Sequence, residues 1–142
     1  MAHKLGARWH LPHGTSNALL LKWVMDFNAD PTPTKMGTFP QYAYPEALER
    51  YAELARRIGC KGKTDKELFT ALQEKFDGLR EGLGLPATIK DALGEKVSEL
   101  EFLESVEKMS RDAFDDQCTG ANPRYPLIEE IKELYKKAYY GE

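Results

Sequence analysis

Residues 3–28, HKLGARWHLPHGTSNALLLKWVMDFN, decide how this chain folds, because polar chemistry and a dense apolar run follow each other directly in them. The stretch contains all three histidines of the protein, His3, His10 and His13. Pro12 disfavours helical backbone in the residue before it, and Gly14 begins a short run of capping residues, so we expect a helix over residues 17–28. His13 would then lie just before the helix N-terminus, where a buried helix can hold a ligand-binding or catalytic group accurately.

The helix expected over residues 17–28 is apolar on nearly every face. Lys22 and Asp26 form only a narrow polar strip among leucine, tryptophan, valine, methionine and phenylalanine side chains. A helix that is apolar all round is usually buried on every side. We therefore expect the remaining helices to pack around it, and we expect its surface to require neighbours that this chain alone does not fully supply.

The rest of the chain predicts amphipathic helices and loops. Apolar residues recur at helical spacing within residues 48–58, 68–79, 103–114 and 127–138, and a short helix is expected over residues 88–93. Residues 1–7 could form the end of a helix closed by Gly6. Residues 29–44 and 115–126 are predicted loops, and Pro45 is expected to open the helix after the first of them. No segment alternates with a period of two, so the predicted fold class is all-α, in one domain over residues 1–142.

Two sequence patterns mark where helices begin. Thr64 precedes Glu67 by three residues, and Ser98 precedes Glu101 by the same spacing. In a capping box of this kind the hydroxyl accepts the N–H of the third helical residue, and the carboxylate accepts the N–H of the capping residue. Helices are therefore expected to start directly after Thr64 and Ser98.

Composition limits the classes of partner and compartment. The formal net charge of the 142 residues is −3, and basic residues alternate with acids instead of forming a patch, so neither nucleic acid nor an anionic membrane is expected as a partner. Cys60 and Cys118 are far apart and belong to no CxxC pair, which indicates a reducing compartment and two buried or half-buried thiols. No signal peptide or membrane span is recognisable, so we expect a cytoplasmic protein.

Three histidines within eleven positions raise the hypothesis of a zinc site. Pro12 argues against it, because His10 and His13 cannot then share one helical face as they would in a helix-borne metal motif. No thiolate and no helix-borne glutamate nearby completes a ligand set. From the residues alone, each histidine could equally be a solvated or hydrogen-bonded side chain, and a self-contained metal site is not expected.

Six short stretches carry a resemblance to a known family. They read MAHKLG from Met1, PHG from Pro12, NALL from Asn17, FPQY from Phe39, AFDDQCTGANPRYPL from Ala113 and AYYG from Ala138. Together these stretches resemble the signature of the iron-containing alcohol dehydrogenases, and most closely the alcohol dehydrogenase half of the bifunctional aldehyde-alcohol dehydrogenases. The resemblance runs from the first residue to the last. Thr15-Ser16 departs from the Leu-Ala that is more usual in the family, which affects packing near His13 but removes no ligand.

The resemblance implies a fold and a ligand set. The fold would be the helical C-terminal domain of the dehydroquinate synthase-like enzymes, without their nucleotide-binding α/β domain. Members bind one divalent metal, Fe²⁺ in most cases with zinc as the alternative, through one aspartate and three histidines. His13 matches the last metal-binding histidine. His3 matches a histidine that lies beside the metal and the nicotinamide without binding the metal, where it would position NAD or relay a proton. The other ligands and the nucleotide-binding domain would lie upstream of Met1, so we expect an incomplete fragment of a larger enzyme.

The implied reaction is the reversible oxidation of ethanol or another short primary alcohol to its aldehyde with NAD. The metal would act as a Lewis acid on the substrate oxygen, while hydride passes to the nicotinamide. The full enzyme would assemble into homo-oligomers or filaments. His10 has no role in the family and is expected to be structural or exposed. Arg124 is interpreted mainly as a packing and capping residue, with support of the site or of a subunit contact as the alternative.

A second function class stays open beside the enzymatic one. One metal ligand out of four cannot hold iron usefully, because metal affinity depends on the number and the geometry of the ligands. The isolated chain is therefore expected to be inactive. It could instead be a non-catalytic helical module, such as a split subunit or a remnant that serves as an interaction or structural unit.

Overall fold

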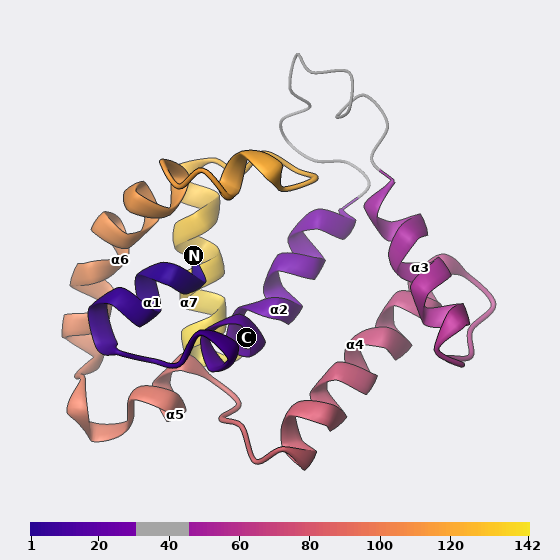
Figure 1. Cartoon of the computed structure of the whole chain (residues 1–142), viewed down its shortest axis with the longest axis horizontal. Coiled ribbons are helices and arrows are strands. Elements are labelled where there is room, and N and C mark those ends of the chain that lie inside the picture. Colours follow the sequence, from indigo (N-terminus) through magenta and orange to yellow (C-terminus); the bar gives the residue numbers. More distant parts are fainter. Residues whose placement is uncertain (31–45) are drawn as a thin grey trace.

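The computed structural model describes residues 1–30 and 46–142, and throughout these residues it contains helices and turns but no strand (Figure 1). This confirms the all-α prediction. The loop expected over residues 29–44 begins one residue late, because Ala29 is the last residue of α2. Residues 31–44 and the expected helix start at Pro45 lie outside the described residues. The α-helices are α1 (Ala2–Trp9), α2 (His13–Ala29), α3 (Ala47–Arg57), α4 (Asp65–Gly82), α5 (Ile89–Leu93), α6 (Glu99–Phe114) and α7 (Ile128–Tyr140), and two short 3₁₀ turns are η2 (Gly94–Lys96) and η3 (Thr119–Ala121).

The larger hydrophobic cluster joins α1, α2, α5, α6 and α7, and α7 contacts α2, α5 and α6 within it. Its largest fully buried side chains include Tyr135, Tyr139 and Phe102. The rings of Phe102 and Tyr139 stack with centroids 4.1 Å apart, which joins α6 to α7. Neither Phe102 nor Tyr139 belongs to the apolar stripes predicted from the sequence. Phe102 comes one residue before the stripe predicted within residues 103–114, and Tyr139 comes one residue after the stripe predicted within residues 127–138.

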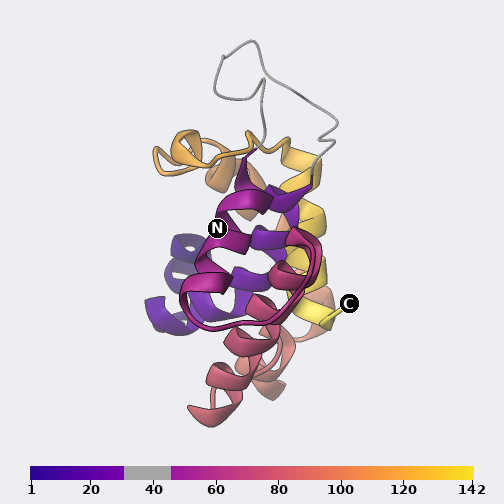
Figure 2. The same ribbon diagram turned by 90° about the vertical axis from the view of Figure 1, so that its right-hand side faces the viewer.

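A smaller cluster holds the α3–α4 hairpin against α2. Its buried members are Met25 and Ala29 of α2, Ala52 and Ala55 of α3, and Leu68, Phe69 and Leu72 of α4. Turned by 90°, the molecule shows α3 and α4 in front of α2 (Figure 2). Helix α2 therefore takes part in both clusters and links the two halves of the fold.

Side-chain caps explain where several helices begin. The Oγ1 of Thr64 and the Oγ of Ser98 each accept the backbone N–H of the residue three positions on, at 3.2 Å. The carboxylate of Glu67 turns back to the N–H of Lys63, one residue before the cap, so this box closes one position early. A complete capping box is formed at Thr88, whose Oγ1 accepts from the N–H of Asp91 while Asp91 accepts from the N–H of Thr88. That box explains how a helix as short as α5 forms.

The structure corrects two expectations about the histidine segment. Helix α1 does not close at Gly6 but continues to Trp9 and ends at His10, whose φ is 57°. Gly6 serves a different purpose, because a Cβ there would lie 3.3 Å from the carbonyl oxygen of Leu11, so glycine lets the returning chain approach α1. Helix α2 begins at His13 instead of after it, since Pro12 occupies the N-cap and its carbonyl accepts the N–H of Ser16 at 2.9 Å.

The expected all-round burial of α2 is wrong for this chain. Leu19, Leu20 and Met25 are at most 3% exposed, whereas Leu21 is 41% exposed and Trp23, Val24 and Phe27 are only partly buried. The physical reason is that α1, α3, α4 and α7 cover α2 from some sides only, as far as the described residues show. Within residues 1–30 and 46–142, no helix combines the length and the apolar character needed to cross a bilayer.

Candidate functional site

Two histidines from neighbouring helices meet at the start of α2. His3 lies in the first turn of α1, and His13 is the first residue of α2. The short connection through Pro12 returns the chain beside α1, so that the two imidazole rings stack with centroids 5.1 Å apart and an interplanar angle of 22°. Both side chains are exposed. Both residues are site residues predicted from the sequence, and the structure brings them together.

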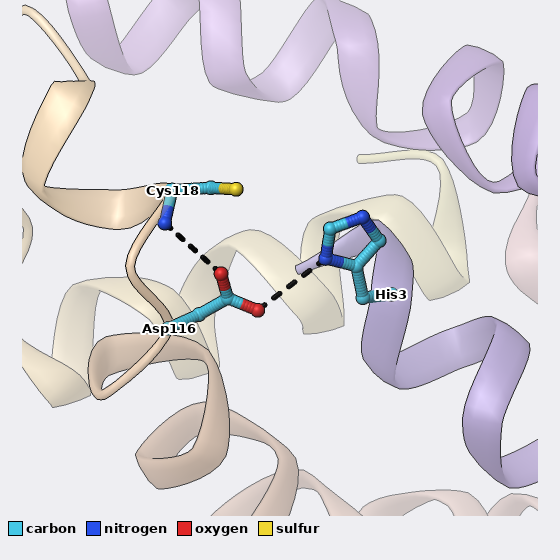
Figure 3. Close-up of side chains that lie close together, drawn as sticks. All are labelled: His3, Asp116 and Cys118. Atoms are coloured by element: carbon cyan, nitrogen blue, oxygen red, sulfur yellow. Dashed lines mark hydrogen bonds and ion pairs between the residues drawn. The ribbon is translucent and has the colours of Figure 1, made fainter.

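Asp116, in the turn after α6, holds His3 in place. Its Oδ2 lies 3.4 Å from Nδ1 of His3 and 3.0 Å from Nζ of Lys4, and its Oδ1 accepts the backbone N–H of Cys118 at 3.0 Å (Figure 3). The Cys118 N–H, together with the Lys4 and His3 side chains, stabilises the carboxylate and keeps the pKa of Asp116 far below its usual range. The carboxylate is therefore a permanent negative charge beside the histidine pair at neutral pH.

His13 offers one nitrogen donor at this end of the molecule. Its Nε2 accepts a hydrogen bond from Nδ2 of Asn17 at 3.0 Å, one helical turn further along α2. Within the described residues, the His, Cys, Asp and Glu side chains close enough to share an ion are His3, Asp116 and Cys118, and His13 is not among them. An exposed imidazole without further ligands fits one corner of an iron site but does not complete one. The residues described here therefore do not suffice to hold the iron that the resemblance implies.

His10 stands apart from the other two histidines. It is exposed, and its backbone N–H donates to the carbonyl of Gly6 at 2.9 Å to close α1. Within the part of the chain that the structure describes, the candidate metal-binding group contains His3 but neither His10 nor His13. His10 is thus a helix-terminating residue, as expected for a structural or exposed position.

Sequence reasoning missed Asp116 and Cys118 as members of the site. Both were placed in a polar loop, and Cys118 was expected to be buried or half-buried, but it is exposed. Cys60 is half-buried, as expected. Asp116 is separated from His3 by 113 residues, and no spacing rule connects the two. The packing of α1 against α6 brings them together, and only the folded chain contains that information.

The loop after α6, which contains Asp116 and Cys118, is attached to the C-terminal end of α2 through Arg124. Its guanidinium donates to the carbonyl of Phe27 at 2.9 Å, to Asp30 at 3.1 Å and to Glu130 at 2.8 Å, and it lies over the Phe27 ring at 3.9 Å. Asn122 adds a hydrogen bond of 2.7 Å to Oδ1 of Asn28. These contacts confirm the packing and capping role expected for Arg124.

An apolar groove of about 340 Å³ adjoins the site. Its walls are formed by α2, by α7 and by the loop that follows α6. Asn17 and Cys118 line its end near the histidines. Leu21, Val24 and Leu134 contribute to its apolar walls. Partly exposed apolar side chains in a groove next to polar groups are typical of a surface that another part of a protein covers.

Comparisons with known proteins agree on one family. The family model for the Fe-containing alcohol dehydrogenase family, C-terminal, matches residues 1–139. The bifunctional aldehyde-alcohol dehydrogenase AdhE of Escherichia coli is 48% identical to the chain and is matched over 99% of the chain but only 16% of its own length. An alcohol dehydrogenase of Thermococcus barophilus is 41% identical, with coverage of 99% and 30%.

The solved structures lead to the same conclusion. The iron-containing alcohol dehydrogenase of Thermococcus thioreducens superposes with a TM-score of 0.70 at 40% identity, over 99% of this chain and 31% of that one. The chain thus spans a minor part of the relatives that it matches. It belongs to the iron-containing alcohol dehydrogenase family, and it corresponds to the C-terminal, helical part of the alcohol dehydrogenase domain found in bifunctional aldehyde-alcohol dehydrogenases.

Proposed function

We propose that this chain forms the helical, metal-side part of an alcohol dehydrogenase that interconverts acetaldehyde and ethanol, or other short primary alcohols, with NAD(H). The observation that carries the proposal is the pairing of His3 and His13 at the start of α2, in a chain whose family match runs over residues 1–139. Fe²⁺, or zinc in its place, would supply Lewis acidity to the complete enzyme.

Within the proposed enzyme, His13 contributes one of four metal ligands, and the others come from a part that this chain does not contain. A ligating nitrogen needs a free lone pair, so binding through Nε2 requires the exposed Asn17 amide to turn away from it. His3 lies beside His13 without joining it as a ligand. Since Asp116 faces Nδ1 of His3, Nε2 is the nitrogen left to face the nicotinamide or to carry a proton.

The isolated chain is proposed to be incompetent. One imidazole cannot fix a metal, and the apolar groove beside α2 fits an upstream nucleotide-binding domain as the part that covers it. We expect no NAD reduction from ethanol when the purified 142-residue chain is incubated with Fe²⁺ under anaerobic conditions. Metal-dependent formation of NADH by this chain alone would overturn the proposed division of ligands.

A chimera tests the proposed function directly. The corresponding C-terminal segment of the Escherichia coli relative, 48% identical, is replaced by this chain. We expect ethanol-linked NAD reduction in the chimera and a loss of about 100-fold or more in kcat/KM, with loss of bound iron, in its His13→Ala variant. His10→Ala is the matched control and is expected to keep both activity and iron. A folded chimera without activity would instead favour the non-catalytic helical module.

A further inference from the structure

We infer that His3, Asp116 and Cys118 form a metal site of their own, suited to a divalent ion of the zinc class and separate from the iron site to which His13 is assigned. One ligand atom from each of the three residues lies within 4.8 Å of the ligand atoms of the other two. Zinc bonds of about 2.0–2.3 Å in tetrahedral geometry place ligand atoms roughly 3.5 Å apart. The 3.4 Å between Nδ1 of His3 and Oδ2 of Asp116 already has this value, so only the thiol has to move closer.

The donor chemistry selects the ion. Imidazole nitrogen, carboxylate oxygen and thiolate sulfur are together the ligands that zinc takes in proteins, and a soft thiolate disfavours magnesium and calcium. His3 and Cys118 are exposed, so an ion can reach the site without local unfolding, and water can take the fourth position. Figure 3 shows the Sγ of Cys118 directed toward the side on which the His3 imidazole lies, with the Asp116 carboxylate between the two residues.

The carboxylate is already oriented for this role. The backbone N–H of Cys118 donates to Oδ1 of Asp116, which leaves Oδ2 directed at His3. Such a hydrogen bond to the second oxygen is the kind of supporting contact that orients carboxylate ligands in metal sites. The ligand that comes from the turn is therefore held before any ion arrives.

The positive charge of Lys4 disfavours metal binding at this site. Its ammonium group lies 3.0 Å from the same Oδ2 of Asp116, and it must turn away before a cation binds there. The Lys4 side chain is 23% exposed and can reach water. Removal of this positive charge is therefore expected to strengthen metal binding, between about threefold and tenfold. An effect in this direction is expected of a site that includes Asp116.

Cobalt(II) titration of the full 142-residue chain tests the inference, because cobalt replaces zinc and reports thiolate ligation through a sulfur-to-cobalt charge-transfer band. We expect that band at one equivalent of Co²⁺ and its removal by added Zn²⁺. Cys118→Ser is expected to abolish the band, and His3→Ala to weaken cobalt binding at least about tenfold. Lys4→Gln is expected to strengthen cobalt binding. Circular dichroism confirms that each variant is folded.

The controls separate this site from the alternatives in the same chain. Cys60→Ser and His13→Ala are expected to keep the charge-transfer band and the affinity unchanged. The inference is overturned if the folded chain shows no such band, if the band survives in Cys118→Ser, or if it disappears in either control. Any of these results would leave the alcohol dehydrogenase proposal untouched, because that proposal is measured by the activity and iron content of the chimera.

Discussion

At the scale of single residues, Arg124 connects more of the described structure than its place in a polar loop suggests. The last carbonyl groups of a helix have no partner within the helix, and α2 carries no basic residue in its last turn. Arg124 supplies that charge from a distant part of the sequence by binding the Phe27 carbonyl. The same guanidinium pairs with Asp30 and Glu130, and its side chain is only 11% exposed.

We predict that Arg124→Ala lowers the free energy of unfolding by about 2–4 kcal/mol. The substitution removes several charge-assisted contacts of a largely buried group, and the polar groups that it contacts lose this hydrogen-bond donor. Urea denaturation measures the change. Arg57→Ala is the control, since Arg57 is 75% exposed and, among the described residues, pairs along its own helix with Glu53. That control should change stability by about 0.5 kcal/mol or less. Equal effects of the two substitutions would show that Arg124 is only a surface residue.

At the scale of elements, α6 and α7 pack through more than their aromatic side chains. Lys132 of α7 pairs with Glu107 of α6 and with Glu129 of its own helix, and its side chain is 16% exposed. The ammonium of Lys132, followed by the guanidinium of Arg111, holds the pKa of Glu107 below its ordinary value. The charged form of Glu107 is therefore favoured by folding.

This shift predicts how stability depends on pH. A carboxyl group whose pKa is depressed in the folded state contributes stability that is fully present above its unfolded pKa, near 4.5, and that is lost as the pH falls through the folded pKa. The wild-type chain should thus be more stable than Glu107→Gln at pH 6–7, and the gap should narrow below about pH 4.5. Urea midpoints at several pH values measure this difference in stability between the wild type and the variant. Glu133→Gln, at an exposed pair within α7, is the control and should differ little from the wild type in stability at any pH. A stability difference for Glu107→Gln that does not change with pH would refute the link between this pKa shift and folding.

At the scale of the whole molecule, the described residues form two hydrophobic clusters that share α2. The larger cluster contains large aromatic side chains such as Phe102 and Tyr135. The smaller one relies on alanines together with Leu68, Phe69 and Leu72. A region with less buried apolar surface opens at a lower free energy than the rest of a protein. The α3–α4 hairpin is therefore expected to be the less stable half.

Native-state hydrogen exchange tests this expectation. Backbone amides in the middle of α4 should exchange with an opening free energy at least about 1 kcal/mol below that of amides in the middle of α6. Met25→Ala, which removes the α2 side chain of the smaller cluster, should lower protection in α4 by about 2–4 kcal/mol and affect α6 less. Equal protection in α4 and α6, or equal losses after the substitution, would mean that the described residues unfold as one unit.

Much of the candidate site and of the fold was accessible from local sequence patterns, for a physical reason. Helical periodicity, the cap at Thr64 and the cap at Ser98 act over a few residues, so they predict helices correctly. The connection through Pro12 is equally local, and it places His13 at the start of α2 with His3 nearby. The boundaries at Gly6 and His13 were wrong, because the close approach of Leu11 to Gly6 and the capping role of Pro12 depend on the chain turning back on itself.

The amino-acid sequence by itself determined the all-α class, the positions of most helices and the two histidines of the family signature, since each of these follows from residues close together in the chain. Only the tertiary structure decided that Asp116 and Cys118 meet His3, that Arg124 closes α2, and that Leu21 stays exposed while its neighbour Leu20 is buried. These features join residues far apart in sequence or depend on which helix covers which face. The burial of apolar surface across the whole chain selects them, and no local pattern contains that information.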